Sequence, residues 1–282
     1  MGIDYRPGGG TRRLWVAGWL LFPSHAAGAT IQTSLPRPLS HAALSTLSSR
    51  GFVVVPGWLP PALTHALLAD ALALERDGLA RSAGVGSPDG ADGMRQDTAV
   101  RRSALCPLYP PPRPSAGDVD TRMLLYEATR MLCEELNDSP LLDTEALSSF
   151  HTELSYLYYP EGGYYKRHRD VPADDDGWYR LGRRPEDGGS FSQAAVRREI
   201  SVLLYLNKGW RAEWGGVLRA FPEAKAEESL DALPVEGSLD VLPEGGTLVL
   251  FRSPQVAHEV MPTRRKRQCI VGWFCAVRSR TD

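Results

Sequence analysis

The hydrophobic pattern of the chain changes near residue 150, and this change limits the folds open to it. From residue 151 onward, short apolar or alternating stretches are separated by turn residues such as Pro243-Glu244-Gly245-Gly246. The stretches predict eight short strands, at residues 154–159, 164–169, 198–206, 216–221, 238–242, 247–252, 256–260 and 267–276. Strands in this number after a helical N-terminal part indicate a mainly β fold with α (α+β). The expected core is a double-stranded β-helix (jelly roll), with helices packed outside one sheet.

The residues ahead of the strands, 39–150, are expected to form a helical N-terminal support region for the strand-rich domain at 151–278. Ser40 is a suitable N-cap for a helix through Arg50, and a buried strand is expected at 52–55. A second helix is predicted from Pro61 to Arg76. A third helix, with Asp120 as its cap, should end near residues 137–140.

Residues 1–38 are interpreted as a leader or a disordered extension. Arg12-Arg13 precede the apolar stretch from Leu14 to Phe22, and Ala27-Gly28-Ala29 has the small-x-small form of a cleavage site. A cleavable signal peptide at 1–29 fits this layout. The scarcity of acidic residues before residue 70 equally suits an organelle transit peptide, and an unprocessed extension is the third alternative.

The composition is that of a soluble globular protein, with 43% hydrophobic and 23% charged residues. A formal net charge of −2 gives no support for a nucleic-acid or membrane partner. The four cysteines, Cys106, Cys133, Cys269 and Cys275, form no CxxC pair and indicate reduced thiols rather than a structural zinc site. This cysteine usage favours a cytoplasmic location, alongside the leader alternatives.

Candidate metal ligands lie in the strand-rich part. In the sequence His168-Arg169-Asp170, side chains two residues apart on a strand point the same way, so both outer residues can grip one ion. His258 follows a later apolar strand and can supply a third ligand. Two imidazoles and one carboxylate on one face of a metal are typical of non-haem Fe(II) oxygenases, which leave the other positions open.

Arg267 begins the last predicted strand, and alternation places its side chain on the same face as Cys269, Val271 and Trp273. A charged residue on an otherwise apolar inward face needs a partner, because an unpaired buried charge is costly. The carboxylate of a cosubstrate would supply that partner. The neighbouring Arg264, Arg265 and Lys266 are expected in a solvated turn.

Three groups of motifs carry a family resemblance. The segments His258-Glu259-Val260-Met261-Pro262, Arg267 and Ile270-Val271-Gly272-Trp273-Phe274 resemble the closing motif of 2-oxoglutarate oxygenases of the prolyl 4-hydroxylase superfamily. The oxygen-sensing (hypoxia-inducible factor type) prolyl hydroxylases are resembled in particular by Tyr158-Tyr159-Pro160 and Leu204-Tyr205-Leu206-Asn207-Lys208, and by Trp210 with Gly215-Gly216-Val217-Leu218-Arg219-Ala220-Phe221-Pro222. The resemblance covers roughly residues 150–276.

The resemblance implies roles for the matching residues. Iron would be bound by His168, Asp170 and His258, and the distal carboxylate of 2-oxoglutarate by Arg267 and the Tyr205 hydroxyl. The cosubstrate and substrate pocket would be lined by Tyr159, Trp273 and Leu218, for which ordinary core packing is an equal alternative. Fe(II), 2-oxoglutarate, O₂ and L-ascorbate as reductant are the implied cofactors and cosubstrates.

The resemblance favours hydroxylation of peptidyl proline in a protein substrate. The alternatives are an oxygenase acting on another residue type or a small molecule, and a non-catalytic binding module that retains the barrel. A nucleic-acid demethylase would need a basic face that the balanced charge does not supply. The stretch from Val171 to Glu199 departs from the pattern of the oxygen-sensing enzymes, so the substrate's identity cannot be carried over.

Overall fold

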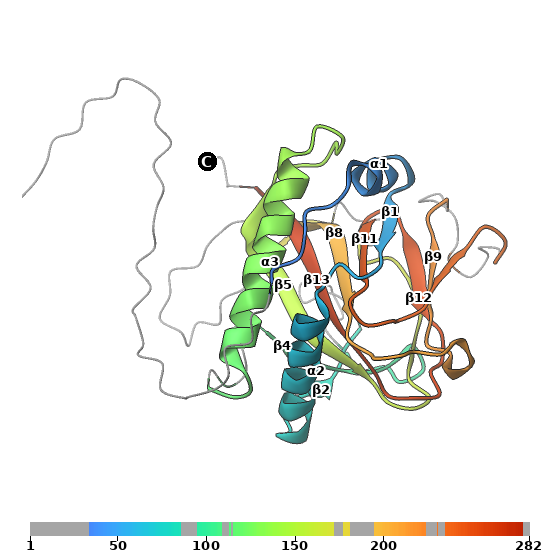
Figure 1. The fold of residues 1–282 in the computed structure, drawn as a ribbon. Coiled ribbons are helices and arrows are strands. Elements are labelled where there is room, and N and C mark those ends of the chain that lie inside the picture. Colours follow the sequence, from blue (N-terminus) through green and yellow to red (C-terminus); the bar gives the residue numbers. More distant parts are fainter. Residues whose placement is uncertain are drawn as a thin grey trace, which may run out of the picture. The chain divides into compact units, whose positions relative to one another are not determined.

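Two antiparallel sheets face each other in the computed structural model of the chain (Figure 1). The structure describes residues 34–85, 95–108, 113, 115–171, 177–180, 195–223, 230 and 235–278. These all belong to the unit Thr33–Asp282. The leader expected at 1–29 and most of the stretch between Val171 and Glu199 lie outside the described residues. The predicted jelly-roll core of a mainly β fold is confirmed.

The larger sheet has eight strands, and β13 and β8 lie near its centre. Its strands, in spatial order, are β1 (Phe52–Val55), β11 (Leu248–Arg252), β8 (Ala195–Tyr205), β13 (Arg267–Arg278), β5 (Leu147–Tyr159), β4 (Ala104–Pro107) and β2 (Arg81–Ser82), with β7 (Tyr179–Arg180) paired to β8. Mostly apolar runs in β8 (residues 200–205) and β13 (residues 269–277) explain why these strands occupy the buried centre.

The smaller sheet has five strands and carries most of the candidate ligands. Its order is β10 (Leu239–Val241), β9 (Leu218–Phe221), β12 (Ala257–Val260), β6 (Tyr164–His168) and β3 (Arg101–Arg102). Every strand predicted from the sequence after residue 150 has a counterpart in one of the two sheets. The strands β2, β3, β4 and β7 were not predicted.

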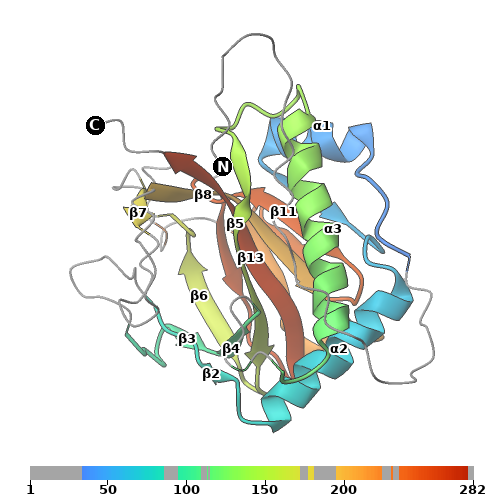
Figure 2. The same ribbon diagram turned by 90° about the vertical axis from the view of Figure 1, so that its left-hand side faces the viewer.

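Three helices cover the larger sheet, namely α1 (His41–Arg50), α2 (Pro61–Arg76) and α3 (Val119–Asp138). Figure 2 shows α2 and α3 on one side of β5 and β13, with β6 of the smaller sheet on the other. Ser40 caps α1 as predicted, accepting a hydrogen bond from the Ala43 backbone N–H. The cap predicted for α3 is wrong: Asp118, not Asp120, accepts from the Thr121 N–H. Asp120 instead lies in the first turn, where its charge favours the helix dipole.

Strand alternation divides the core into two layers. Ile270 and Phe274 of β13 pack in the cluster between the larger sheet and the helices, whereas Cys269 and Val271 pack between the two sheets. This is the division predicted for β13. It places the residues on the face of Arg267 in the space between the sheets. The expected domain boundary at residue 150 stays a prediction, although β1, β2 and β4 from the preceding region pair into the larger sheet.

Candidate metal centre

The three predicted ligands meet at one end of the smaller sheet. His168 is the last residue of β6 and pairs with His258 of β12, and Asp170 lies just beyond the end of β6. Oδ1 of Asp170 is 3.7 Å from Nε2 of His168 and 3.9 Å from Nε2 of His258. The ligand atoms of the three residues lie within 4.8 Å of one another. They can therefore hold one metal ion.

Backbone contacts orient both imidazoles toward that position. Nδ1 of His168 lies 2.8 Å from the Lys166 carbonyl oxygen, and Nδ1 of His258 lies 3.2 Å from the Val256 carbonyl oxygen. A carbonyl can only accept, so each Nδ1 carries the proton and donates it. The lone pair then resides on Nε2, the atom that faces Asp170 in both cases.

Burial and charge set protonation states that suit metal binding. Burial, together with the neighbouring His168, lowers the pKa of His258 to about 4. For Asp170, burial alone would raise the pKa. Interactions with His258 and His168 and a hydrogen bond from Ser201 more than offset it and hold the pKa well below its usual range. A neutral His258 and an ionised carboxylate are the forms that bind a metal ion.

Arg267 is fully buried at the start of β13, opposite Tyr159 of β5. Its guanidinium carbon lies 4.8 Å from the centre of the Tyr159 ring and 5.1 Å from that of the Tyr205 ring. One nitrogen, Nη1, is 3.5 Å from the sulfur of Cys269. Two tyrosine rings therefore flank the guanidinium, and Arg267 faces inward as the alternation of β13 predicts.

The donors of this pocket fit an anionic ligand. Within the described part of the chain, no hydrogen-bond partner is found for Nε and Nη2 of Arg267 or for the Tyr205 hydroxyl. Buried donors without partners are costly. A carboxylate bound between them would satisfy the guanidinium fork and the phenol together. The residues present thus fit a carboxylate group, such as the distal carboxylate of 2-oxoglutarate.

The remaining predicted pocket residues fall into two groups. Tyr159 and Leu218 are buried in the cluster between the sheets, and burial raises the pKa of Tyr159 to about 12, so its phenol stays protonated. Trp273 is partly exposed instead, and the Arg198 guanidinium lies 3.6 Å from its ring centre. It pairs across the strands with Ser201, which binds Asp170, so it lies on the metal side of the site.

The metal position and the Arg267 pocket are linked by the cluster of residues packed between the two sheets. The Phe251 ring lies 4.6 Å from that of His258, and Phe251 belongs to the same cluster as Tyr159 and Tyr205. On the other side, the Tyr165 ring stacks on His168 at 3.6 Å between ring centres. Phe251 and Tyr165 were not predicted as site residues, because aromatic residues in strands are usual in any β core.

Ser201 is a further site residue that the sequence analysis missed. Its hydroxyl lies 2.6 Å from Oδ2 of Asp170 and its side chain is fully buried. A signal was present in the sequence, since Ser201 is a polar residue in an apolar strand and alternates onto the face of Leu203 and Tyr205.

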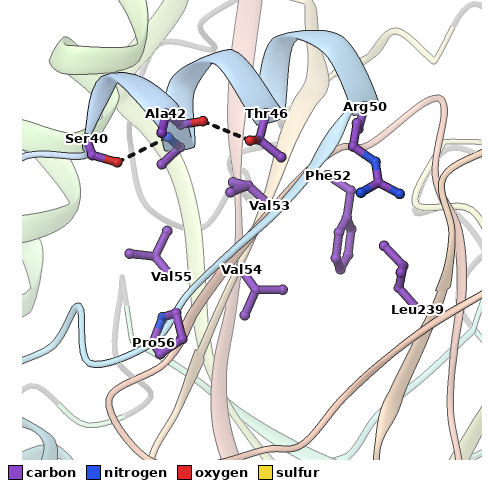
Figure 3. Close-up of a pocket in the computed structure, with 11 residues that line it drawn as sticks. Ser40, Ala42, Thr46, Arg50, Phe52, Val53, Val54, Val55, Pro56 and Leu239 are labelled. Carbon is purple, nitrogen blue, oxygen red and sulfur yellow. Dashed lines mark hydrogen bonds between the residues drawn. The ribbon is translucent and has the colours of Figure 1, made fainter.

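A hollow of about 400 Å³ lies beside β1 and α1 (Figure 3). Its lining is mainly aliphatic and includes Val53, Val55 and Leu239, with Arg50 as its one charged residue. None of the predicted site residues lines it. It offers no metal-ligating side chain and is separate from the metal centre.

Comparison with known proteins agrees with this geometry. Residues 154–275 match the family model described as the 2OG-Fe(II) oxygenase superfamily. Among curated proteins, no significant match is found. A prolyl 4-hydroxylase from Pseudomonas putida is 26% identical, with a TM-score of 0.57 over 85% of this chain and 98% of that one.

Two structures of lower sequence identity share the fold. A prolyl hydroxylase from Trichoplax adhaerens, in complex with a hypoxia-inducible factor peptide fragment, is 19% identical, with a TM-score of 0.61 over 82% of this chain and 86% of that one. The α-ketoglutarate-dependent epimerase SnoN from nogalamycin biosynthesis is 17% identical, with a TM-score of 0.51 over 83% of this chain and 82% of that one. The matches agree in assigning residues 154–275, which include the three candidate metal ligands and Arg267, to the 2OG-Fe(II) oxygenase superfamily. A prolyl 4-hydroxylase is among the structures that share the fold of the chain.

Proposed function

We propose that the chain hydroxylates peptidyl proline at carbon 4 in a protein substrate, using O₂ and 2-oxoglutarate and releasing succinate and CO₂. The observation that carries the proposal is a set of three buried donors on Arg267 and Tyr205 that have no partner among the described residues. They lie in the core layer that also contacts the metal ligand His258 through Phe251. A metal triad alone would suit many enzymes. A metal triad beside a buried carboxylate receptor suits a 2-oxo acid oxygenase.

In this proposal His168, Asp170 and His258 hold Fe(II). Bound Fe(II) would supply the oxidising chemistry that places one oxygen atom of O₂ on a C–H bond while 2-oxoglutarate loses CO₂. The His258 imidazole donates its lone pair without first losing a proton, because burial lowers its pKa to about 4. L-Ascorbate is the proposed reductant that keeps the iron ferrous.

The second group of residues orients the cosubstrate. Arg267 donates two parallel hydrogen bonds to the distal carboxylate, and the Tyr205 hydroxyl donates a third. Tyr159 and Leu218 form apolar walls that exclude water from this carboxylate. Exclusion of water strengthens each charged contact in the pocket.

The choice of proline rests on relatives and on the metal side of the site. The relative from Pseudomonas putida, a prolyl 4-hydroxylase, matches almost its whole length to this chain. Trp273, partly exposed and stacked by Arg198, offers a flat apolar surface beside Asp170 for a substrate ring. We propose that a proline-containing segment lies against this surface.

The test uses the full-length protein with Fe(II), 2-oxoglutarate, O₂ and ascorbate, and a library of proline-containing proteins. Mass spectrometry should find a gain of one oxygen atom on proline, and amino-acid analysis should identify 4-hydroxyproline. Neither mark should form with the Asp170→Ala variant. Succinate production with unmarked proline would instead indicate another residue type or a small molecule. Absence of succinate with iron bound would indicate a non-catalytic binding module.

A further inference from the structure

Two buried serine hydroxyls form a chain of hydrogen bonds that leads from Asp170 into the core. Ser201 of β8 lies 2.6 Å, oxygen to oxygen, from Oδ2 of Asp170. The hydroxyl of Ser253, just after β11, lies 2.8 Å from that of Ser201. Both serines are fully buried. Neither hydroxyl belongs to the metal-binding or cosubstrate-binding residues described above.

The chemistry of the three groups gives this chain of hydrogen bonds a direction. A carboxylate that binds a metal ion is ionised, so each oxygen of Asp170 can only accept a hydrogen bond. Ser201 therefore donates its single hydroxyl proton to Oδ2. With that proton used, Ser201 can only accept from Ser253, which must donate.

The two carboxylate oxygens of Asp170 therefore have different partners. Oδ1 is the atom that faces Nε2 of both His168 and His258, at 3.7 and 3.9 Å. Oδ2 is occupied by the Ser201 hydroxyl. We infer that Ser201, backed by Ser253, is a positioning residue that restricts Asp170 to binding the metal through one oxygen. This inference rests on the proposed metal site.

The consequence concerns the positions left open on the metal. A carboxylate that bound through both oxygens would take one of the positions that the triad leaves for cosubstrate and oxygen. A charge-assisted hydrogen bond to Oδ2 opposes that rotation. Ser201 thus keeps room for a chelating 2-oxo acid as well as strengthening the metal site.

The two serines are held by the sheet itself. Ser201 pairs with Phe251 of β11 on one side and with Trp273 of β13 on the other. The backbone N–H of Ser253 donates to the Glu199 carbonyl at 2.9 Å. Because strands on both sides fix the donors, the carboxylate is oriented before a metal ion arrives.

The experiment compares Ser201→Ala, Ser253→Ala and the wild type in the full-length protein, with Mn(II) as the probe metal. Loss of a hydrogen-bond partner of a metal ligand typically weakens metal binding about 10- to 100-fold. We expect calorimetry to show a loss in this range for Ser201→Ala. The loss should be smaller for Ser253→Ala, in which Ser201 keeps its proton for Asp170. With Mn(II) saturating, Ser201→Ala should also bind 2-oxoglutarate more weakly.

Thr129→Val is the matched control. Thr129 is buried in α3, where its hydroxyl donates to the Leu125 carbonyl. Its replacement therefore removes a buried hydroxyl from a helix that supplies none of the metal ligands. It should change the unfolding temperature of the metal-free protein and leave Mn(II) affinity unaltered. A Ser201→Ala protein that behaves in the same way would overturn the inference. Should that variant fail to fold, unaltered Mn(II) affinity in Ser253→Ala would overturn it.

This outcome is separable from that of the proposed function. Metal and 2-oxoglutarate binding are measured without any proline substrate. Failure to find 4-hydroxyproline would therefore leave the role of Ser201 standing. Failure of the wild type to bind Mn(II) would remove both.

Discussion

Replacement of Arg267 by alanine is the sharpest test of the cosubstrate pocket. Arg267 is fully buried, and two of its nitrogens, Nε and Nη2, have no partner within the part of the chain that the structure describes. Hydrogen bonds to a charged group contribute about 1.5–3 kcal/mol each, so two of them contribute about 3–6 kcal/mol. Water that enters the space left by the side chain hydrogen-bonds to the ligand and recovers part of this binding free energy. We therefore expect a loss near the lower limit, about 3 kcal/mol, or roughly a 100-fold higher 2-oxoglutarate requirement.

Arg267→Lys should give an intermediate result. Lysine keeps the positive charge but presents one compact ammonium instead of a planar fork, so one of the two parallel bonds is lost. The expected rise in the 2-oxoglutarate requirement is about 10-fold, the equivalent of one charge-assisted bond. The 2-oxoglutarate requirement should be highest in the alanine variant, intermediate in the lysine variant and lowest in the wild type. The difference between lysine and wild type then measures the effect of the planar fork, and the difference between alanine and lysine measures the effect of the charge.

The assay measures 2-oxoglutarate binding to the Mn(II)-loaded protein by calorimetry and, in parallel, succinate formation with Fe(II) at varied 2-oxoglutarate. Arg264→Ala is the matched control, because this arginine lies exposed in the turn before β13. Its removal should change neither measurement. If Arg267→Ala binds 2-oxoglutarate as tightly as the wild type, Arg267 is not the carboxylate receptor and the reasoning from its unpartnered donors fails.

Three further predictions follow from particular contacts. Asp170→Ala removes the oxygen that faces both histidines, so metal content and iron-dependent succinate formation should both be lost; retained activity would contradict the triad. In the metal-free protein, burial lowers the pKa of His258 from 6.5 to about 4. Between pH 6.5 and pH 4, His258 is therefore protonated in the unfolded chain but not in the folded chain. As the pH drops from 6.5 to 4, His258 should therefore lower the free energy of unfolding by about 3 kcal/mol. Urea unfolding should show a correspondingly smaller fall in His258→Gln, and an equal fall would refute the assignment. In Gly272→Ala, the added methyl carbon would lie 2.2 Å from the Glu153 carbonyl oxygen, so the unfolding temperature should drop by the equivalent of about 1–3 kcal/mol or more. An unchanged unfolding temperature would show that β13 and β5 can separate at no cost.

Much of the fold was predictable because its signals are local. The alternation of Arg267, Cys269 and Val271 against Ile270 and Phe274 is a property of one strand, and it correctly assigned each residue to its layer. The cap of α1 is likewise local, because the Ser40 hydroxyl accepts from the backbone N–H of Ala43, three residues further on. The strands that were missed, such as β2 and β3, have two residues each and exist only through pairing with a neighbour. No periodicity can reveal them.

The helix cap of α3 shows how tertiary context shifts a boundary. The predicted cap, Asp120, lies two residues beyond the observed cap, Asp118, whose backbone N–H also donates to the buried carboxylate of Asp70 in α2. That contact, with Arg122 in the same buried group, holds the start of the helix at Asp118. A residue 48 positions away therefore helps to decide where the helix begins.

The sequence by itself determined which chemical groups the site contains: two imidazoles, a carboxylate, a guanidinium and a phenol, on strands whose alternation turns them inward. The tertiary structure decided which of them meet and in what state. Ser201 and Ser253 are 52 residues apart and come into contact only because β8 and β11 pair. The neutral state of His258 likewise depends on burial by residues from other strands. Ligand types are properties of residues, whereas proximity and desolvation are properties of the packed chain.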